Sequence, residues 1–303
     1  MKETLNRLGT EQVNPDSLHM DTASEDEFLT MLSRANFEAA QAVQDAQPML
    51  EKALKLVREK MLSGGRLVYC GAGTSGRLGV LDASECPPTF GVPNDLVVGV
   101  MAGGDRALRF SSESTEDHEE IGAADMKNIA LNAQDVLVAI AASGRTPYCI
   151  GALRYARSVG AATIALSCNI NAKMSAEADV AVELNTGAEV LTGSTRMKAG
   201  TATKMALNAL STGAMVALGK VYQNLMVDMK ATNEKLRDRA VRMLLTATET
   251  SDPDHAAELL RQADGSVKLA LVMEKTHSTK DEAKALLEQA HGIASNAIAL
   301  KNT

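Results

Sequence analysis

The stretch RLVYCGAGTSG, residues 66–76, decides the class of fold. It begins with a short apolar run and continues into a glycine-rich loop that carries hydroxyl groups. Four more short apolar runs follow along the chain, and their length and composition are typical of buried parallel strands. Helix-like segments alternate with these runs, which predicts an α/β fold with a doubly wound sheet of five parallel strands. The predicted strands are Arg66–Cys70, Leu96–Met101, Val136–Ala141, Ala162–Ser167 and Asp179–Leu184.

The gaps between the runs indicate where the helices lie. Helices are expected at Arg77–Ser84, Ile121–Leu131 and Pro147–Val159, whereas residues 168–178 leave room only for a short turn. In the strand order 2-1-3-4-5 the first and third strands are neighbours at the topological switch point, and ligands bind in the crevice there. The loops after these two strands are therefore the first place to look for a site.

Helical sequence flanks the predicted sheet on both sides. Residues 24–27, Ser-Glu-Asp-Glu, predict a capping box that opens a helical arm, with a break at Pro48. After the sheet we expect a long helix from about Thr195 to Tyr222, another over Asn233–Thr248, and three or four short helices to the end. The predicted organisation is an N-terminal helical arm (1–56), a sheet domain (57–230) and a small all-helical C-terminal domain (231–303).

Composition excludes several classes of protein. The 303 residues carry a formal net charge of -7, and no basic stripe marks a nucleic-acid surface, which also argues against a helix-turn-helix DNA reader in the tail. No apolar run is long enough to cross a membrane, and the polar N-terminus does not resemble a signal peptide. The four cysteines form no Cys-x-x-Cys pair, so we expect neither a disulfide framework nor a zinc site. Cys70 and Cys168 stand at the ends of strand-like runs and are expected to be small buried hydrophobes. A cytoplasmic location is the expectation.

The first loop, residues 71–76, matches the pattern Gly-x-Gly-x-x-Gly of dinucleotide-binding folds. Such a fold places an acidic residue after the second strand, but here that strand ends in Met101-Ala102-Gly103-Gly104. The hydroxyls of Thr74 and Ser75 favour a sugar or phosphate ligand instead. The structural alternative is a glycine-rich turn that binds nothing.

The loop after the third strand carries Ser143, Gly144, Arg145 and Thr146 ahead of Pro147. Proline suits the first turn of a helix, so the loop predicts an anion site at a helix N-terminus, and we expect the phosphate here. The alternative is an ordinary Ser/Thr cap. Because two such loops follow strands that are expected to be neighbours, ligand binding explains them better than capping alone.

A third segment, GAEVLTGSTRMKAGTATK (residues 187–204), opens the long helix, with Ser194 or Thr195 as its expected cap. So many hydroxyls are poor helix formers unless another function uses them. The alternative is a capped helix with a solvated basic face. A helix this rich in small apolar residues also predicts a homodimer, since a symmetric contact is the usual way to cover such a surface.

Together these segments resemble the sugar isomerase (SIS) family of phosphosugar-binding domains, and within it the N-acetylmuramic acid 6-phosphate etherases. The resemblance covers nearly the whole chain. Glucokinase regulatory proteins share the last run, but they are much longer and have duplicated domains. The motifs that carry the resemblance are Gly71–Gly79, Leu81–Thr89, Ser143–Pro147 and Glu189–Lys204.

The resemblance implies a lyase of cell-wall recycling that acts on a small phosphosugar without a metal or organic cofactor. Water would cleave the D-lactyl ether of N-acetylmuramic acid 6-phosphate, giving N-acetylglucosamine 6-phosphate and D-lactate. The two acid/base glutamates of the family match Glu85 and Glu116. A phosphosugar isomerase and a non-catalytic phosphosugar-sensing regulator are the alternatives. The expected substrate- and phosphate-binding residues are Gly73, Thr74, Ser75, Ser143, Gly144, Arg145, Thr146, Glu189, Ser194 and Lys198.

The glutamates can also be interpreted from their own surroundings. Pro87 is expected to stop the preceding helix, which would leave Glu85 at the negative end of the helix dipole, where the protonated form suits a general acid. The alternative is a surface residue at a helix end. Glu116 follows Ser114 and Thr115, so it is either a base or a first-turn residue of a capped helix. Glu113 and Glu189 are rival candidates for the base.

Overall fold

The computed structural model describes residues 8–110, 115–229, 234–248 and 250–301. The chain divides into two compact units. The first comprises Met1–Ser84 and Asp95–Gly213, and the second comprises Glu85–Asn94 and Ala214–Thr303. The domain boundaries expected at 56/57 and 230/231 stay predictions, and the second of them falls outside the described residues.

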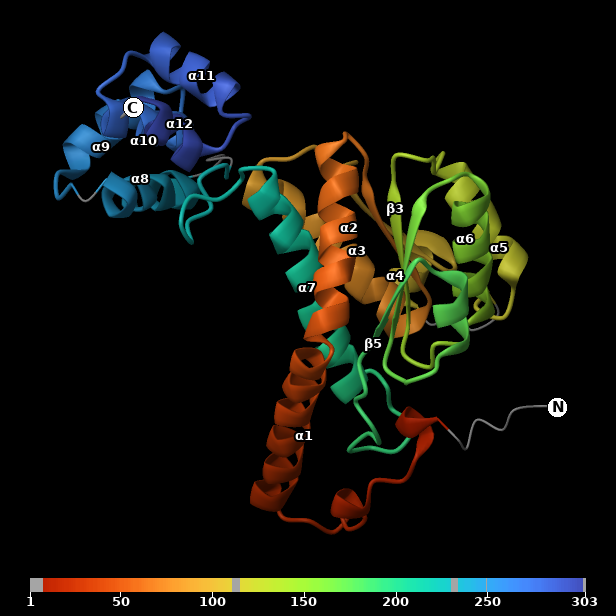
Figure 1. Ribbon diagram of the computed structural model, residues 1–303. Helices are drawn as coiled ribbons and strands as arrows, with labels where there is room; N and C mark the ends of the chain where they lie inside the picture. The colour runs from red at the N-terminus through yellow and green to blue at the C-terminus, as the bar shows by residue number, and fades with distance from the viewer. Residues whose placement is uncertain (1–7, 111–114, 230–233, 249, 302–303) are drawn as a thin grey trace. The chain divides into compact units, whose positions relative to one another are not determined.

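The first unit is built on a parallel sheet of five strands in the order β2-β1-β3-β4-β5 (Figure 1). This confirms the predicted fold class and strand order. Gly71 at the end of β1 pairs with Met101 on one side and Ile140 on the other, so the loops after β1 and β3 leave the same edge side by side. The strands are β1 Leu67–Gly71, β2 Val97–Met101, β3 Val136–Ala141, β4 Ala162–Ser167 and β5 Val180–Glu183.

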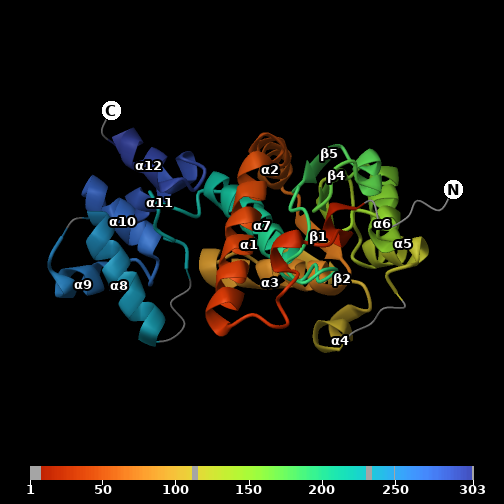
Figure 2. The same cartoon turned by 90° about the horizontal axis from the view of Figure 1, so that it is seen from below.

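Helices cover both faces of this sheet, with α2, α3 and α7 on one face and α5 and α6 on the other (Figure 2). A buried polar contact joins the first group to the sheet, because the Tyr69 hydroxyl donates to Asp82 on α3 at 2.9 Å and Asn208 on α7 donates to the same carboxylate at 2.6 Å. The helices are α1 Glu25–Asp45, α2 Gln47–Leu62, α3 Gly73–Phe90, α4 Gly104–Arg109, α5 Glu119–Asn128, α6 Pro147–Ser158 and α7 Lys198–Ala217, and β4 and β5 are joined through the short η4 Lys173–Glu177.

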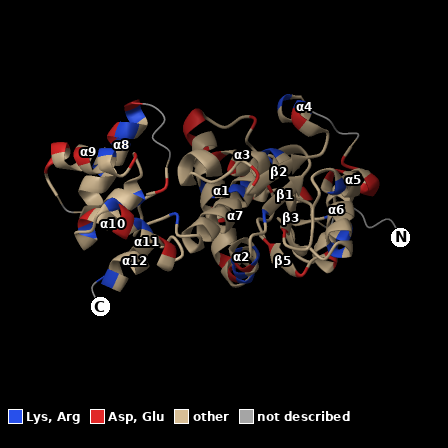
Figure 3. Cartoon of the chain, turned by 90° about the horizontal axis from the view of Figure 1, so that it is seen from above, with Lys and Arg blue, Asp and Glu red and all other residues tan. Residues whose placement is uncertain are grey.

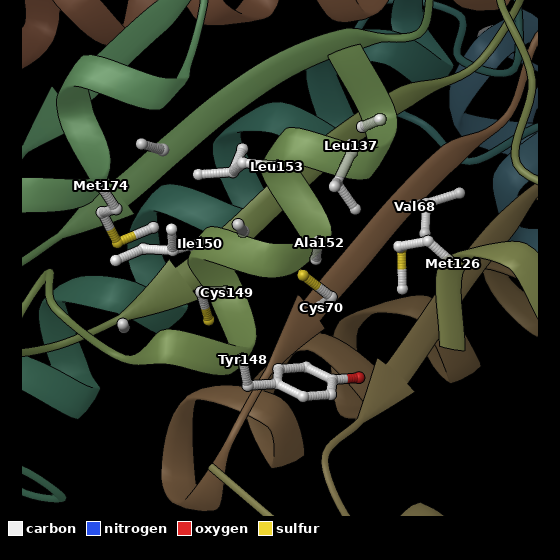
Figure 4. Packing of buried hydrophobic residues seen from close by; sticks show 14 of the residues in the cluster. Val68, Cys70, Met126, Leu137, Tyr148, Cys149, Ile150, Ala152, Leu153 and Met174 are labelled. Atoms are coloured by element: carbon white, nitrogen blue, oxygen red, sulfur yellow. The ribbon is translucent and has the colours of Figure 1, made fainter. Parts of the chain in front are cut away.

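A core of buried hydrophobic side chains fixes α5 and α6 against the sheet (Figure 4). The two helices approach so closely that a Cβ at Gly151 would overlap the carbonyl of Glu119. Tyr148, fully buried at the start of α6, donates its hydroxyl to Asp125 at 2.8 Å. The N-terminus of α6, and the loop that precedes it, therefore has little freedom to move. Labelled members of the core are Val68, Cys70, Met126, Leu137, Tyr148, Cys149, Ile150, Ala152, Leu153 and Met174.

The predicted features of the N-terminal arm are confirmed. Ser24 and Glu27 form the reciprocal capping box, with the Ser24 N–H donating to the Glu27 carboxylate at 2.9 Å. The helical arm breaks as expected, since α1 ends at Asp45 and α2 begins at Gln47 with Pro48 in its first turn. All four cysteines are buried and free, and the burial of Cys70 and Cys168 confirms their interpretation as small hydrophobes.

The second unit contains a small helical bundle with its own hydrophobic core. Four short helices follow α8 in the described residues, in agreement with the three or four expected, and Gly265, His277-Ser278 and Gly292 lie at their joints. Buried Lys268 pairs with Asp228 at 2.5 Å, so its charge is compensated within this unit. The helices are α8 Glu234–Thr248, α9 Pro253–Gln262, α10 Val267–Thr276, α11 Lys280–Gln289 and α12 Ala294–Lys301.

The helices α3 and α7 differ most from the prediction. α3 does not stop before Pro87 but continues through Pro87 and Pro88 to Phe90, where the Gly91 N–H donates to the Pro87 carbonyl at 2.9 Å. Proline has a helical φ, and the burial of Cys86 and Phe90 offsets the two backbone hydrogen bonds that the prolines remove. α7 spans Lys198–Ala217, which is shorter at both ends than the expected Thr195–Tyr222.

Charged residues lie mainly on the helices and loops, where acidic and basic residues are interspersed along the chain (Figure 3). Of the five described strands, β5 carries the single charged residue, Glu183. Its carboxylate accepts the N–H groups of Asn171 and Ala172, each at 2.9 Å, so it has a structural role. No helix in the described part of the chain is long and apolar enough to cross a membrane.

Candidate active site

A cavity of about 230 Å³ lies in the first unit where β1 and β3 end. Its volume is just below the roughly 300–1,000 Å³ of ligand pockets for drug-sized molecules. The walls come from the β1–α3 loop, the β3–α6 loop and the start of α7, together with two carboxylates from other segments. The lining residues are Glu11, Ala72, Gly73, Thr74, Ser75, Glu116, Ala141, Ala142, Ser143, Thr146, Thr195, Gly200 and Thr203.

The first wall is the beginning of α3. Gly73 has φ +54°, and a Cβ on Gly71 would crowd the backbone of Ser75 and Gly76, so the tight turn requires these glycines. The first backbone hydrogen bond of this turn is donated by the Gly76 N–H to the Ala72 carbonyl at 3.1 Å. The N–H groups of residues 73–75 precede it, at the positive end of an 18-residue helix, where anions bind. Thr74 and Ser75 add hydroxyls to this wall.

The second wall is the β3–α6 loop, from which Ser143 and Thr146 face the cavity. Thr146 stands at the cap position of α6 without a side-chain cap bond, so the ordinary-cap alternative is wrong for this residue. The first turn of α6 has few donors to offer an anion. Pro147 lacks an N–H, and the Tyr148 N–H already donates to the Glu116 carbonyl at 3.0 Å. An anion at this loop therefore depends on hydroxyls more than on the helix N-terminus.

The third wall is the start of α7, and its cap is not the residue expected. The Glu189 carboxylate accepts the N–H groups of Lys198 at 2.9 Å and Ala199 at 2.8 Å. Ser194 and Thr195 precede the helix, so their expected role as caps is wrong, although Thr195 does line the cavity. Glu189 itself is fully buried.

Burial raises the pKa of Glu189, while the backbone hydrogen bonds from Ala199 and Lys198 and the charge of Lys198 lower it. The Lys198 side chain is 3% exposed, and its Nζ donates to Glu38 on α1 at 2.7 Å. The alternative of a solvated basic face is therefore wrong at Lys198. Both residues hold the start of α7 in place rather than line the cavity.

Thr203 is buried and contacts both the cavity and a cysteine. Its hydroxyl lies 3.5 Å from the Cys168 Sγ, which also donates to the Ala199 carbonyl at 3.5 Å. Burial raises the pKa of the Cys168 thiol to about 12, so the thiolate that a nucleophile needs is not formed at neutral pH.

The two predicted catalytic glutamates differ in their placement. Glu116 lines the cavity. It precedes α5, whose cap residue is His118, so the interpretation of Glu116 as a first-turn residue of that helix is wrong. Glu85 belongs to the second unit and is exposed on α3. α3 ends at Phe90, so Glu85 is not among its last residues. The interpretation of Glu85 as a residue at the helix end is therefore wrong. Glu113 lies outside the described residues.

The structure thus brings part of the predicted set together and adds residues that the sequence did not indicate. Predicted residues that line the cavity are Gly73, Thr74, Ser75, Glu116, Ser143 and Thr146; among the described residues, Glu85, Gly144, Arg145, Glu189, Ser194 and Lys198 do not line it. Glu11 was missed because it lies far ahead of the first strand and belongs to no motif. The density of hydroxyls in residues 187–204 was the available signal for Thr203.

Comparison with known proteins identifies the family of the chain. Residues 49–157 match the glucokinase regulatory protein N-terminal SIS domain, and residues 111–213 match the SIS domain. An N-acetylmuramic acid 6-phosphate etherase from Actinobacillus succinogenes is 50% identical over 297 residues, covering 98% of this chain and 97% of the relative. The chain belongs to the N-acetylmuramic acid 6-phosphate etherase family.

Another etherase and a solved structure extend the comparison. The etherase from Bacillus subtilis is 50% identical over 300 residues, which is 98% of both chains. Within the family the similarity is thus spread over the whole chain, the helical second unit included. A phosphoheptose isomerase from Francisella tularensis is 18% identical, with a TM-score of 0.48 over 64% of this chain and 97% of that one.

Proposed function

We propose that this protein cleaves the D-lactyl ether of N-acetylmuramic acid 6-phosphate with water, giving N-acetylglucosamine 6-phosphate and D-lactate. The observation that carries the proposal is the identity of about half of all residues, over nearly the full length, with relatives that bear this name. A cavity lined by hydroxyls and carboxylates suits a phosphorylated sugar. The enzyme is therefore a carbon–oxygen lyase that acts on an amino sugar.

The phosphate group is proposed to bind between the first two walls. Ser143 and Thr146 offer hydroxyl donors on one side, and Thr74 and Ser75 offer hydroxyls and helix N-terminal N–H groups on the other. This arrangement supports Ser143 and Thr146 of the predicted site at residues 143–146, with a larger share for the start of α3 than we expected from the sequence.

An elimination is the route that this substrate makes accessible. An ether resists direct displacement because an alkoxide is a poor leaving group. In the open-chain sugar, the C1 aldehyde acidifies the proton on C2, and the lactyl oxygen on C3 lies β to that carbonyl. Loss of the C2 proton and protonation of the C3 oxygen expel lactate and leave a C2=C3 double bond. Water then adds at C3, and C2 regains a proton.

This chemistry needs one base and one acid, which two carboxyl groups in different environments can supply. We assign Glu116 as the base at C2, which its position in the cavity supports. We assign Glu85 as the acid that protonates the lactyl oxygen and later activates water, which its match to the family's second glutamate supports. Phosphate binding would hold the substrate against these groups.

The direct test is incubation of the purified protein with N-acetylmuramic acid 6-phosphate and measurement of D-lactate. In heavy water the sugar product should gain deuterium at C2, and in oxygen-18 water the label should enter at C3 of the sugar. Label in lactate would contradict the elimination. Conversion of a ketose or aldose phosphate without lactate release would indicate an isomerase, and binding without turnover would indicate a regulator.

Two variants separate the proposed roles of the glutamates. Glu85→Gln should block lactate release more than exchange of the C2 proton, because deprotonation can proceed without the acid. Glu116→Gln should suppress both. Glu51→Gln, an exposed position on α2, is the matched control and should change neither. Equal loss of both signals in Glu85→Gln would contradict the assignment.

Two broader statements remain part of the proposal. The helix α7 buries one face, including Ala202, Ala206 and Leu210, and exposes a strip with Met205, Ala209 and Thr212. This strip is a smaller surface than the sequence led us to expect, and we propose that it contributes to a homodimer.

A cytoplasmic location fits a metabolic enzyme of this family.

A further inference from the structure

An N-terminal segment outside the sheet reaches the cavity. Gly9–Glu11 form a short helical turn, and the last of these residues, Glu11, lines the cavity together with Ser143 and Glu116. The predicted acid/base pair and phosphate-binding loops leave this carboxylate without a role.

A buried clamp fixes the position of this segment. Thr10 is fully buried, and its N–H donates to Asn169 Oδ1 at 3.3 Å, while Asn169 Nδ2 donates to the Thr10 hydroxyl at 2.9 Å. Nδ2 also donates to the carbonyl of Ala142 at 2.9 Å. Asn169 follows β4, and Ala142 directly precedes Ser143. The clamp therefore ties Glu11 to the same edge of the sheet as the proposed phosphate loop, although 159 residues separate Thr10 from Asn169.

The lining residues offer a ligand two kinds of group, carboxylates and neutral donors. Among the described residues that line the cavity, Glu11 and Glu116 are the charged ones. The walls from α3 and the β3–α6 loop present hydroxyl and N–H donors. A phosphate dianion is repelled by carboxylates and attracted by N–H and hydroxyl donors. The hydroxyl and amide N–H groups of an amino sugar are neutral donors, for which a carboxylate is a strong acceptor.

We infer that Glu11 is a substrate-binding residue whose carboxylate accepts hydrogen bonds from the hydroxyl or amide N–H groups of the sugar. The inference deepens the proposed function and rests on it for the identity of the sugar. Glu11 selects the sugar part of the ligand, whereas Ser143 and Thr146 bind the phosphate. Thr10 and Asn169 act as positioning residues, since they hold the segment that carries Glu11.

The test compares a phosphosugar with inorganic phosphate, which lacks the groups that Glu11 would bind. In Glu11→Ala, the Kd for N-acetylglucosamine 6-phosphate and the KM for N-acetylmuramic acid 6-phosphate should rise about 10-fold or more, the loss expected for a hydrogen bond to a charged group. The Kd for inorganic phosphate should stay within about twofold. Ser143→Ala should weaken both ligands, and the control Glu51→Gln neither. Unchanged phosphosugar binding, or equal weakening of both ligands, would overturn the inference.

The clamp offers a second, independent measurement. Thr10→Val removes the hydroxyl that accepts from Asn169, so it should raise the Kd for the phosphosugar, and Thr10→Ser should restore it. In the double variant Thr10→Val/Glu11→Ala the losses of phosphosugar affinity should not add, because both substitutions act through the contact between Glu11 and the sugar. Additive losses would contradict the role of the clamp. A wild-type protein that binds the phosphosugar but releases no D-lactate would contradict the proposed function alone, and the Glu11 comparison would still decide this inference.

Discussion

The cap of α7 allows a sharp prediction about stability. The Glu189 carboxylate is fully buried and accepts two backbone N–H groups, from Lys198 at 2.9 Å and Ala199 at 2.8 Å. Replacing Glu189 by alanine leaves both donors without their acceptor. Two hydrogen bonds to a charged group contribute about 3–6 kcal/mol, and relief from burying a carboxylate offsets part of that. We expect Glu189→Ala to lower the free energy of unfolding by about 2–4 kcal/mol.

Glu189→Gln keeps one acceptor oxygen and turns an NH₂ group toward the second N–H, so about 1–2 kcal/mol should be lost. Unfolding in urea, followed by circular dichroism, measures both changes, with a separate fit for each unit if two transitions occur. Hydrogen exchange at the Lys198 and Ala199 amides should accelerate in both variants. The control Glu51→Gln should stay within about 0.5 kcal/mol of the wild type.

The pH dependence of the Glu189→Gln effect tests the cause of the pKa shift. Burial raises the pKa of Glu189 above its ordinary value of 4.5, so between the two values the folded state binds more protons than the unfolded state. The stability that this raised pKa contributes is complete below the unfolded pKa and is lost as pH rises through the folded pKa. Glutamine does not titrate, so the advantage of the wild type should be largest in acid and shrink toward neutral pH. An advantage of the wild type that grows with pH would contradict the raised pKa of Glu189.

Two further predictions concern substrate binding and assembly. Ser143→Ala should raise KM by about 10-fold or more, because the lost hydroxyl would bond a charged phosphate; unchanged substrate affinity in both Ser143→Ala and Thr146→Ala would rule out the phosphate site. In sedimentation experiments at micromolar concentration the protein should be a dimer, and Met205→Glu on the exposed strip of α7 should shift it toward monomer. A wild-type monomer under these conditions would contradict the homodimer.

The part of the fold that could be predicted from the sequence is the part that local patterns determine. Each strand is a short apolar run, and the strand order follows from the way parallel α/β units wind. The loops after β1 and β3 could be placed in one site for the same reason. The prolines in α3 misled the prediction, since proline is compatible with helical φ and the burial of Cys86 and Phe90 decides where the helix ends.

The remainder depends on contacts between distant segments. Glu189 and Lys198 look like binding residues in the sequence because both are charged and stand beside hydroxyls. In the structure one of them caps α7 and the other pairs with Glu38, which lies 160 residues away. The position of Glu11 depends on the clamp between Thr10 and Asn169, which leaves no local pattern. Helix propensity and strand periodicity carry no information about such pairs.

Backbone hydrogen bonds hold together the segments that line the cavity. The Glu116 carbonyl accepts the Tyr148 N–H at the start of α6, and the Ala142 carbonyl accepts the amide of Asn169. Both tethers end on the β3–α6 unit that presents Ser143 and Thr146. A base must be held close to its proton throughout the reaction, and small displacements are costly for such chemistry. A phosphate bound to Ser143 and Thr146 would therefore lie on the same fixed unit that holds the base and the N-terminal segment, so the substrate would meet a site that is already organised before the C2 proton is removed.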